Sequence, residues 1–237
     1  MGNNLDKISV LMAAYNSADT LKVSINSVLN QTYKNLEFLI LDDASEDNTY
    51  EILEQYKILD SRIKIFKNSK NTGLTKSLNF LLQEAKGKFI ARQDADDISH
   101  PERFKTQIDY MIKYNLHFST TRALRMGTKR KIPGLSFYFP TKMIIKYKNP
   151  FIHGSLMIKK STINNIGNYD EAFYYAQDFK LITDLIKSKY RYRVINKPLY
   201  SLNMNDNISS KFEDQQQYYA DCVRKKINPV TSLWNFI

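Results

Sequence analysis

The chain has one cysteine, Cys222, among its 237 residues. A single thiol excludes a disulfide framework and a cysteine-based metal site, and it fits a reducing compartment. The sequence also lacks an apolar run long enough to span a bilayer. Residues 1–6 are polar and contain no signal-peptide pattern. These absences predict a cytoplasmic protein, either free or in peripheral contact with the inner face of the cell membrane.

Acidic side chains are absent from residues 110–169. This stretch contains eleven basic residues, as many as the net charge of +11, so 24 basic and 24 acidic residues balance elsewhere. The eleven are Lys113, Arg122, Arg125, Lys129, Arg130, Lys131, Lys142, Lys146, Lys148, Lys159 and Lys160. The imbalance indicates an anionic partner near the second half, or a solvated basic face with no partner. Because the sequence shows no zinc spacing and no recognition motif, we expect no nucleic-acid partner.

The first hundred residues alternate predicted strands and helices with short connections. Hydrophobic patterning predicts strands at 8–13, 36–41, 63–66 and 89–91, and helices at 19–30, 45–59 and 74–86. This alternation favours a parallel sheet with helices on both faces. Right-handed crossovers place all the strand ends on one edge, so the polar clusters at 13–16, 42–43 and 94–97 should converge in one crevice.

Three carboxylates, Asp94, Asp96 and Asp97, follow the short apolar strand at 89–91, which lies between charged flanks. Asp94 and Asp96 are two residues apart, so on an extended backbone they point to the same side. Hard oxygen ligands of this kind suit Mg²⁺ or Mn²⁺ that holds a phosphate. The alternative is a solvated acidic turn that caps a helix starting at 99–102.

The second half is less regular. It contains predicted helices at 103–114, 140–147, 160–166, 176–188 and 211–227 and predicted strands at 118–125, 152–158, 190–195 and 199–204. Residues 126–139 form a basic, loop-like segment. The final Trp234-Asn-Phe-Ile237 has an apolar character that suits a membrane, a partner or the protein's own core.

Five motifs occur in a fixed order along the chain. They are the run at 8–16, Asp42-Asp43, Gly73-Leu-Thr-Lys-Ser-Leu-Asn79, Gln93-Asp-Ala-Asp-Asp97 with Pro101-Glu-Arg-Phe104, and Gln177-Asp178. In this order the chain resembles family 2 glycosyltransferases, densely from residue 7 to about 111 and more thinly from 150 to 207. The resemblance implies an α/β fold of the GT-A type, with a Rossmann-like, mostly parallel sheet, helices on both faces and a mixed acceptor-binding half.

The resemblance implies one domain over 1–237. Residues 1–110 would bind the nucleotide sugar, 111–210 the acceptor, and 211–237 would form a C-terminal helical tail. No low-complexity linker or internal repeat divides the chain.

The resemblance also implies a set of donor-binding residues. Ala13, Tyr15 and Asp43, with Asp42, would hold the nucleotide, since a carboxylate accepts from the uracil N–H and an aromatic ring stacks on the base. Taken alone, Tyr15 also fits a core tyrosine and Asp43 a helix cap. Lys76 would reach the diphosphate or remain a solvated helix lysine. Asp94-Ala95-Asp96 matches the metal-binding triplet, so Asp94 and Asp96 would bind Mn²⁺ or Mg²⁺, with Asp96 in the most direct contact.

In the second half, Asp178 matches the catalytic base of the family, and it also fits a helix N-cap. Gln177 stands where many members have Glu, and this loss of one charge should leave the pKa of Asp178 less raised. The resemblance places Gln177 and His153 near the acceptor, whereas His153 alone also fits a satisfied core histidine.

These residues imply a metal-dependent, inverting transfer of a hexosyl or N-acetylhexosaminyl group from a nucleoside diphosphate donor, a UDP-sugar being favoured, to a hydroxyl. The implied setting is bacterial surface polysaccharide or lipooligosaccharide biosynthesis. A lipid- or phosphate-bearing carbohydrate acceptor would suit the basic second half, as would an anionic membrane. The alternatives are a non-catalytic nucleotide-binding module and a nucleotidyltransferase of similar sheet architecture. The latter would normally have a glycine- and arginine-rich loop where this chain has Ala14-Tyr-Asn-Ser17.

Overall fold

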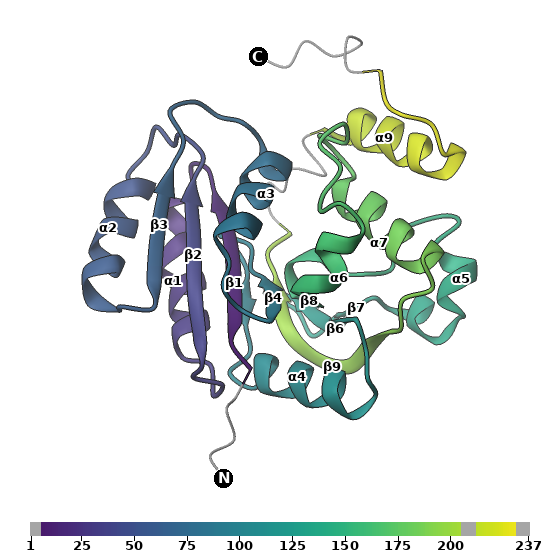
Figure 1. The fold of residues 1–237 in the computed structure, drawn as a ribbon, viewed down its shortest axis with the longest axis horizontal. Coiled ribbons are helices and arrows are strands. Elements are labelled where there is room, and N and C mark those ends of the chain that lie inside the picture. The colour runs from purple at the N-terminus through teal and green to yellow at the C-terminus, as the bar shows by residue number, and fades with distance from the viewer. Residues whose placement is uncertain (1–5, 205–211, 231–237) are drawn as a thin grey trace.

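The computed structural model describes residues 6–204 and 212–230, and it contains one mixed sheet between two layers of helices (Figure 1). The strands are β1 (Ile8–Ala14), β2 (Leu36–Asp42), β3 (Ile63–Lys67), β4 (Phe89–Arg92), β5 (Ile98–Ser99), β6 (Phe118–Arg125), β7 (Lys131–Ile132), β8 (Met157–Lys159) and β9 (Tyr192–Leu202). The helices are α1 (Ala18–Leu29), α2 (Thr49–Leu59), α3 (Leu74–Glu84), α4 (Arg103–Lys113), α5 (Thr141–Ile144), α6 (Lys160–Asn165), α7 (Gln177–Lys187) and α9 (Glu213–Lys225), with 3-10 turns η1 (Leu135–Tyr138) and η2 (His153–Ser155). The chain start, Lys211 and the segment 234–237 lie outside the described residues.

The sheet has the strand order β3-β2-β1-β4-β8-β6-β9-β5, with β7 paired to β6. Strands β1 to β4 are parallel to their neighbours among themselves, and β8 pairs antiparallel with both β4 and β6. This confirms a GT-A type α/β sheet with a parallel first half and a mixed second half. The change of direction at β8 puts the second half directly beside the carboxyl end of β4.

Alternation along the strands explains why both faces are covered. In β1, Val10 and Met12 pack into the core beneath α1, α2 and α4, while Leu11 packs into the other core beneath α3, α6 and α7. Successive strand residues point to opposite faces, so a strand that is apolar at every position must be buried on both. Each fully buried aliphatic side chain contributes roughly 1.5–3 kcal/mol, and these two layers are therefore the main source of stability.

Three predicted strands in the second half differ from the structure. The predicted strand at 152–158 is the turn η2 followed by the three-residue β8, because the Ser155 hydroxyl bonds to the Ile152 carbonyl (2.9 Å) and accepts from the Thr121 amide (3.1 Å). The predicted strands at 190–195 and 199–204 are one strand, β9. Its pairing with β6 shifts register between Thr121 and Ala123, and Pro198 lies in the shifted part. A bulge accommodates a proline that a regular ladder would reject.

The helix predicted to start at 99–102 begins at Arg103, because Ser99 belongs to the short strand β5. Within residues 6–204 and 212–230, no helix combines the length and apolar character needed to cross a membrane.

Candidate active site

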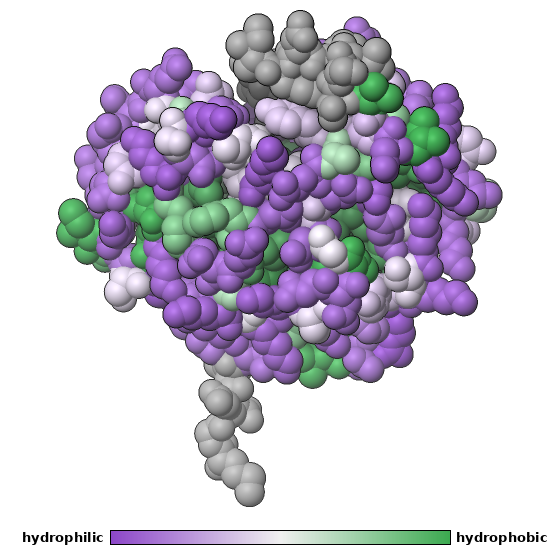
Figure 2. All heavy atoms as spheres, turned by 45° about the horizontal axis from the view of Figure 1, so that its top comes forward, coloured by the Kyte–Doolittle hydropathy of each residue, from purple (hydrophilic) through white to green (hydrophobic). Residues whose placement is uncertain are grey.

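The ends of β1, β2 and β4 lie side by side at the upper edge of the sheet in Figure 1. Ala14 pairs with Asp42, and the Asp43 amide donates to the Ala14 carbonyl at 2.9 Å. The Gln93 amide donates to the Leu11 carbonyl at 3.1 Å, which brings the acidic turn after β4 to the same edge. The three polar clusters therefore lie at the ends of neighbouring strands, as predicted, and their convergence in a single crevice stays a prediction. Figure 2 turns this edge toward the viewer and shows a mostly hydrophilic surface with apolar patches between the polar residues.

A cavity of about 680 Å³ opens beside the ends of β1, β2 and β3. Ligand pockets typically measure roughly 300–1,000 Å³, so this cavity is large enough for a nucleotide. Tyr15 is 46% exposed at its wall, which leaves the ring face available for stacking and excludes a core position. The lining residues are Tyr15, Ala44, Ser45, Glu46, Lys67, Asn68, Ser69, Lys70 and Asn71.

The two acids after β2 have different surroundings. The buried Asp43 carboxylate accepts four hydrogen bonds, from Asn68 Nδ2 (2.7 Å), Thr72 N (2.9 Å), Thr72 Oγ1 (3.1 Å) and Gly73 N (2.8 Å). It therefore fixes the loop that forms one side of the cavity. The buried Asp42 accepts from the Ser45 amide at 3.3 Å through Oδ1, and within the described residues its Oδ2 has no hydrogen-bond partner. Of these two acids, only Asp42 has a carboxylate oxygen that accepts no hydrogen bond from the described residues.

The Gly73–Asn79 motif joins the two halves of the molecule. Asn79 donates to the Tyr169 carbonyl (2.9 Å) and accepts from the Tyr169 amide (3.1 Å), and Thr75 Oγ1 donates to the Phe173 carbonyl (3.0 Å). Gly73 has a φ of +86°, and a side chain there would collide with the Tyr174 ring. Lys76 is exposed on the first turn of α3, and Ala13 is half-buried at the end of β1.

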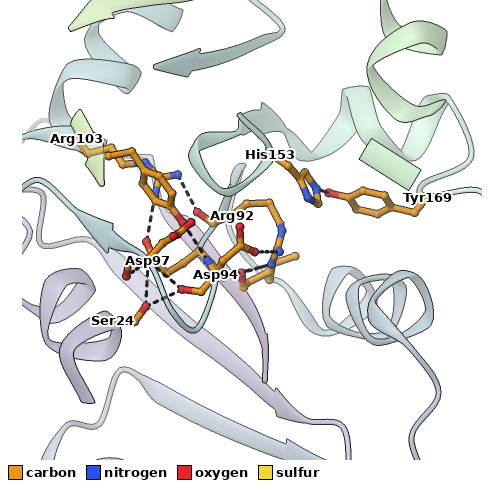
Figure 3. A network of polar contacts seen from close by, with 10 residues as sticks. Ser24, Arg92, Asp94, Asp97, Arg103, His153 and Tyr169 are labelled. Atoms are coloured by element: carbon orange, nitrogen blue, oxygen red, sulfur yellow. Dashed lines mark hydrogen bonds and ion pairs between the residues drawn. The ribbon is translucent and has the colours of Figure 1, made fainter. Parts of the chain in front are cut away.

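Figure 3 shows the acidic turn after β4 held by a buried polar network. The buried Arg92 guanidinium forms an ion pair with Asp94, and the Asp94 amide donates to Tyr200 Oη at 3.1 Å. Buried Arg103 donates to the Arg92 carbonyl (2.7 Å) and to the Gln93 side chain (3.2 Å). These contacts fix the backbone from which Asp94, the buried Ala95 and Asp96 project.

Asp96 is half-buried, and burial, with the nearby Asp94 charge, raises its pKa to about 6. No ion pair to Asp96 occurs within the described part of the chain, so a cation there would relieve the repulsion from Asp94. The described residues contain no group of three or more metal-ligating side chains. Mg²⁺ and similar ions usually need only one or two carboxylates when substrate phosphates complete the coordination, so Asp96 and Asp94 fit a divalent ion that enters with a diphosphate.

Asp97, also buried, accepts from the Asn203 amide at 2.7 Å. Burial, followed by the Asp94 and Asp96 charges, raises its pKa to about 8. Asp97 therefore braces the turn from inside and does not face a ligand.

Asp178 lies in the first turn of α7, after Ala176, which is the N-cap in a left-handed conformation (φ +52°). Its Oδ2 accepts from Asn149 Nδ2 and its Oδ1 from the Phe179 amide, both at 2.7 Å. Burial raises the pKa of Asp178, and the Asp94 charge adds to this shift. The carboxyl thus has a raised pKa even with Gln177, which is half-buried, in the position before it. The Asp94 charge acts on Asp178 although the two acids are distant in sequence.

His153 lies next to this site and donates to or accepts from the Tyr169 hydroxyl at 2.7 Å, as Figure 3 shows. Burial, with the Arg92 charge, lowers the pKa of His153 well below its usual value, so the ring is neutral. Burial raises the pKa of Tyr169 above its usual value, so this hydroxyl keeps its proton. His153 and Tyr169 are thus both neutral, and the Arg92 charge acts on each of them.

Several site residues were not identified from the sequence. Arg92, Tyr200 and Asn149 hold the acids, and Gly154 lies directly against the Asp94 carboxylate and the Tyr200 hydroxyl, where a Cβ atom has no room. Only Gly154, beside a histidine within an otherwise apolar segment, offered a sequence signal, because an isolated glycine in a predicted strand often marks a close approach.

Residues 9–169 match the family model described as glycosyl transferase family 2. Over 240 residues the chain is 31% identical to the UDP-Glc:alpha-D-GlcNAc-diphosphoundecaprenol beta-1,3-glucosyltransferase WfgD of Escherichia coli, an alignment that covers 97% of this chain and 92% of WfgD. The alignments of this chain with two other relatives, glycosyltransferases from Bacillus subtilis and Haemophilus influenzae, cover 61% of the length of each relative.

Two solved structures share the fold. S. aureus TarS 1-349 in complex with UDP-GlcNAc superposes with a TM-score of 0.74 at 20% identity, over 87% of this chain and 61% of that one. The mannosyltransferase PcManGT from Pyrobaculum calidifontis, in complex with GDP-Man and Mn²⁺, gives 0.74 at 15% identity, over 96% and 67%.

Proposed function

The chain belongs to glycosyl transferase family 2, and we propose that it transfers a sugar from a nucleoside diphosphate donor to an acceptor hydroxyl with inversion at the anomeric carbon. The observations that support this most strongly are the acidic turn at the end of β4, beside β1, whose end opens on the nucleotide-sized cavity, and the Asp178 carboxyl, whose pKa is raised by burial and by the Asp94 charge. A non-catalytic nucleotide-binding module would need the cavity but not a second carboxylate with a raised pKa.

The donor would lie along the edge from the cavity to the acidic turn. Tyr15 offers a face for the base. Asp42 is buried with its Oδ2 unpartnered within the described residues, so it would accept from a base or ribose N–H or O–H only if the donor reached in beside it. Asp43 acts by holding the loop 68–73, and the exposed Lys76 is free to reach toward a diphosphate. We favour a UDP-sugar because the TarS structure of the same fold contains UDP-GlcNAc and the relative WfgD is named for UDP-Glc.

Asp96, supported by Asp94, would hold Mn²⁺ or Mg²⁺ with the diphosphate, and PcManGT was solved with Mn²⁺. When bound, such an ion neutralises charge that develops on the leaving diphosphate. Arg92 keeps Asp94 in a fixed orientation. The hydrogen bond from Arg103 to the Arg92 carbonyl would keep the backbone of the acidic turn in place when the anionic donor binds.

Asp178 would act as the base. Each of its oxygens accepts one hydrogen bond, which leaves a lone pair for the acceptor hydroxyl proton. The hydroxyl oxygen then forms a bond to the anomeric carbon while the bond to the diphosphate breaks on the opposite face, and the diphosphate leaves with the electron pair. A raised pKa brings Asp178 nearer to neutral pH and makes it a better proton acceptor. The direct displacement converts an α-linked donor into a β-linked product.

We propose a phosphate- or lipid-bearing carbohydrate as the acceptor, in bacterial surface polysaccharide synthesis, with peripheral contact to an anionic membrane. The name of WfgD specifies a diphosphoundecaprenol-linked sugar. The excess of basic residues in the second half of this chain suits an acceptor of that charge. His153 and Gln177 border the region that such an acceptor would enter.

The decisive test is Asp178→Asn, assayed against a panel of sugar nucleotides with Mn²⁺ and a lipid-linked pyrophosphate sugar. We expect transfer to fall by about 100-fold or more, the usual effect of losing a general base, while donor binding measured by calorimetry stays the same. Asp109→Asn, which removes an exposed ion pair with Lys105, is the matched control and should keep full activity. Unchanged turnover in Asp178→Asn would remove the residue from this role, and donor binding by the native protein without any transfer would favour the binding module.

A further inference from the structure

Residues 135–147, which include η1 and α5, expose large apolar side chains. Five such side chains lie within thirteen residues, and Leu135 is 82% and Tyr147 75% exposed. The five are Leu135, Tyr138, Phe139, Met143 and Tyr147. Together with six basic residues, which the next paragraph names, they make up what we call the α5 surface. Isolated exposed apolar residues are ordinary, but a group of this size on one short segment indicates an interaction site.

Basic side chains flank this group on both sides. Six of them are exposed, and none forms an ion pair within the described part of the chain. They are Lys129, Arg130, Lys131, Lys142, Lys146 and Lys148. Because residues 110–169 contain no acid, nothing on the segment itself offsets this charge. The combination favours a partner that is both apolar and anionic.

Hydrogen bonds and packing contacts hold the backbone of the α5 surface against the rest of the protein. Arg122, which is buried, lies 4.8 Å from the centre of the Phe137 ring and donates to the Pro133 carbonyl at 2.9 Å. Arg224 of α9 donates to the Tyr147 carbonyl at 2.6 Å, and Ile145 packs against the cores beneath. These contacts hold the backbone in place while the apolar side chains named above remain exposed.

We propose that the α5 surface docks the protein on an anionic lipid bilayer. Tyrosine and phenylalanine rings are common in the interface between lipid headgroups and acyl chains. Leu135 and Met143 would enter the boundary of the acyl chains beside these rings. The flanking lysines and arginines would meet anionic headgroups, each contributing about 1 kcal/mol near the surface. A protein partner would need a matching acidic and apolar face, whereas an anionic bilayer presents both properties over any area.

The position of the α5 surface gives docking a consequence. Asn149 follows Lys148 directly and donates to Asp178 at 2.7 Å, so the segment that meets the bilayer is continuous with the residue that holds the proposed base. In Figure 1, α5 lies on the side of the molecule away from α2 and β3. Docking would thus bring the acceptor side of the site to the membrane, a step that rests on the proposed function, while the donor cavity stays open to solution.

The experiment is flotation of the full-length protein with vesicles of phosphatidylcholine alone or mixed with phosphatidylglycerol. We expect binding only with the anionic lipid, and a decline as salt is raised. Lys142→Gln/Lys146→Gln/Lys148→Gln should weaken partitioning by about fivefold for each lysine lost. The matched control, Lys22→Gln/Lys34→Gln/Lys86→Gln, removes the same charge from exposed lysines elsewhere and should bind as the native protein does.

A second pair of variants tests the apolar component. Tyr138→Ser/Phe139→Ser should weaken binding at high and low salt alike, whereas Ile58→Ser/Leu59→Ser, which removes two exposed apolar residues at the end of α2, should not. Equal binding of all variants, binding that ignores lipid charge, or tighter binding to duplex DNA than to vesicles would overturn the proposal. Transfer to a water-soluble acceptor should persist in every variant. A variant that loses vesicle binding but keeps transfer would therefore support the docking proposal without bearing on the proposed function. Absence of transfer in the native protein would contradict the proposed function and leave the docking result unaffected.

Discussion

Two opposing influences act on the Asp178 carboxyl, which makes its pKa adjustable by one neighbour. Burial and Asp94 raise the pKa, while the hydrogen bonds from Asn149 and the Phe179 amide lower it. Asn149→Ala removes a donor to the charged form, so the pKa should rise further. Since the ionised form accepts the proton, the acidic limb of the activity profile should move to higher pH.

Because a hydrogen bond to a charged group contributes more than one between neutral groups, we expect a displacement toward higher pH that a rate profile resolves. The measurement is transfer rate against pH at saturating donor. Asn164→Ala, at an exposed position of α6, should leave the profile in place. A profile that does not move in Asn149→Ala would show that Asn149 does not control the titration.

Gly154 should be intolerant of a single methyl group. A Cβ atom there meets the Asp94 carboxylate and the Tyr200 hydroxyl at less than contact distance, and both belong to the network that orients the acidic turn. Gly154→Ala should therefore reduce transfer by more than about tenfold, consistent with the large effect of small displacements in an active site. Gly134→Ala has only the Lys131 carbonyl within reach, at 3.8 Å, and should retain native activity. Calorimetry of Mn²⁺-dependent donor binding would show whether the acidic turn has moved.

At the scale of residues, the acids could be predicted because a carboxylate after a buried strand is a departure from the surrounding pattern. Their partners could not. Arg92 stands at the end of an apolar run, where the sequence suggests a charged flank, yet it is buried against Asp94. Tyr200 belongs to an apolar strand and contacts the turn only because β9 crosses beneath it. Such roles depend on long-range packing, which no local pattern records.

At the scale of elements, Glu37 ties together the strands at the end of the sheet opposite the site. Its carboxylate accepts from Ser9 Oγ in β1 (2.7 Å), Lys64 Nζ in β3 (2.9 Å) and the Lys86 amide before β4 (2.7 Å). Burial alone would raise the pKa of Glu37, but these bonds and the nearby Lys7 lower it from 4.5 to about 2. A lowered pKa means that the stabilisation is complete above pH 4.5 and is lost as the pH falls toward 2.

Glu37→Gln should therefore lower the free energy of unfolding by about 2 kcal/mol at pH 7, and by progressively less below pH 4.5. Urea titrations at a series of pH values would measure this. Glu54→Gln, which removes an exposed ion pair with Lys57 in α2, should change stability little at any pH. A constant difference between native protein and Glu37→Gln down to pH 2 would mean that the ionised carboxylate is not the source of the stabilisation.

The elements themselves were predictable where each is long and periodic. Strands β1, β2 and β3 and helices α1, α3 and α7 match the expected ranges to within a few residues, because buried strands and amphipathic helices have distinct periods. Prediction failed at β8 and at the middle of β9. The three residues of β8 are too short to have a period, and Pro198 lies between two predicted strands, 190–195 and 199–204, that form one strand with a bulge against β6.

At the scale of the whole molecule, the order β3-β2-β1-β4-β8-β6-β9-β5 makes one continuous sheet of the first and second halves of the chain. Asn79 and Thr75 of α3 also bond across to the segment before α7, so the two halves share polar contacts as well as strands. This arrangement predicts a single domain that unfolds in one cooperative transition.

The same continuity predicts how the donor affects stability. UDP with Mn²⁺ at about 100 times its dissociation constant should add ~2.7 kcal/mol to the native state, or about 5–10 °C in Tm for a chain of this size. Because one sheet connects the halves, far-ultraviolet and tyrosine signals should shift together. Asp96→Asn should have the same Tm as the native protein in the absence of ligand at neutral pH, but it should lose the part of the Tm shift that depends on Mn²⁺. The control is Asp60→Asn, which removes an ion pair with Arg62 far from the site and should retain the Mn²⁺-dependent shift. Two separate transitions would contradict the single domain, and a Mn²⁺-dependent shift that survives Asp96→Asn would place the ion on other ligands.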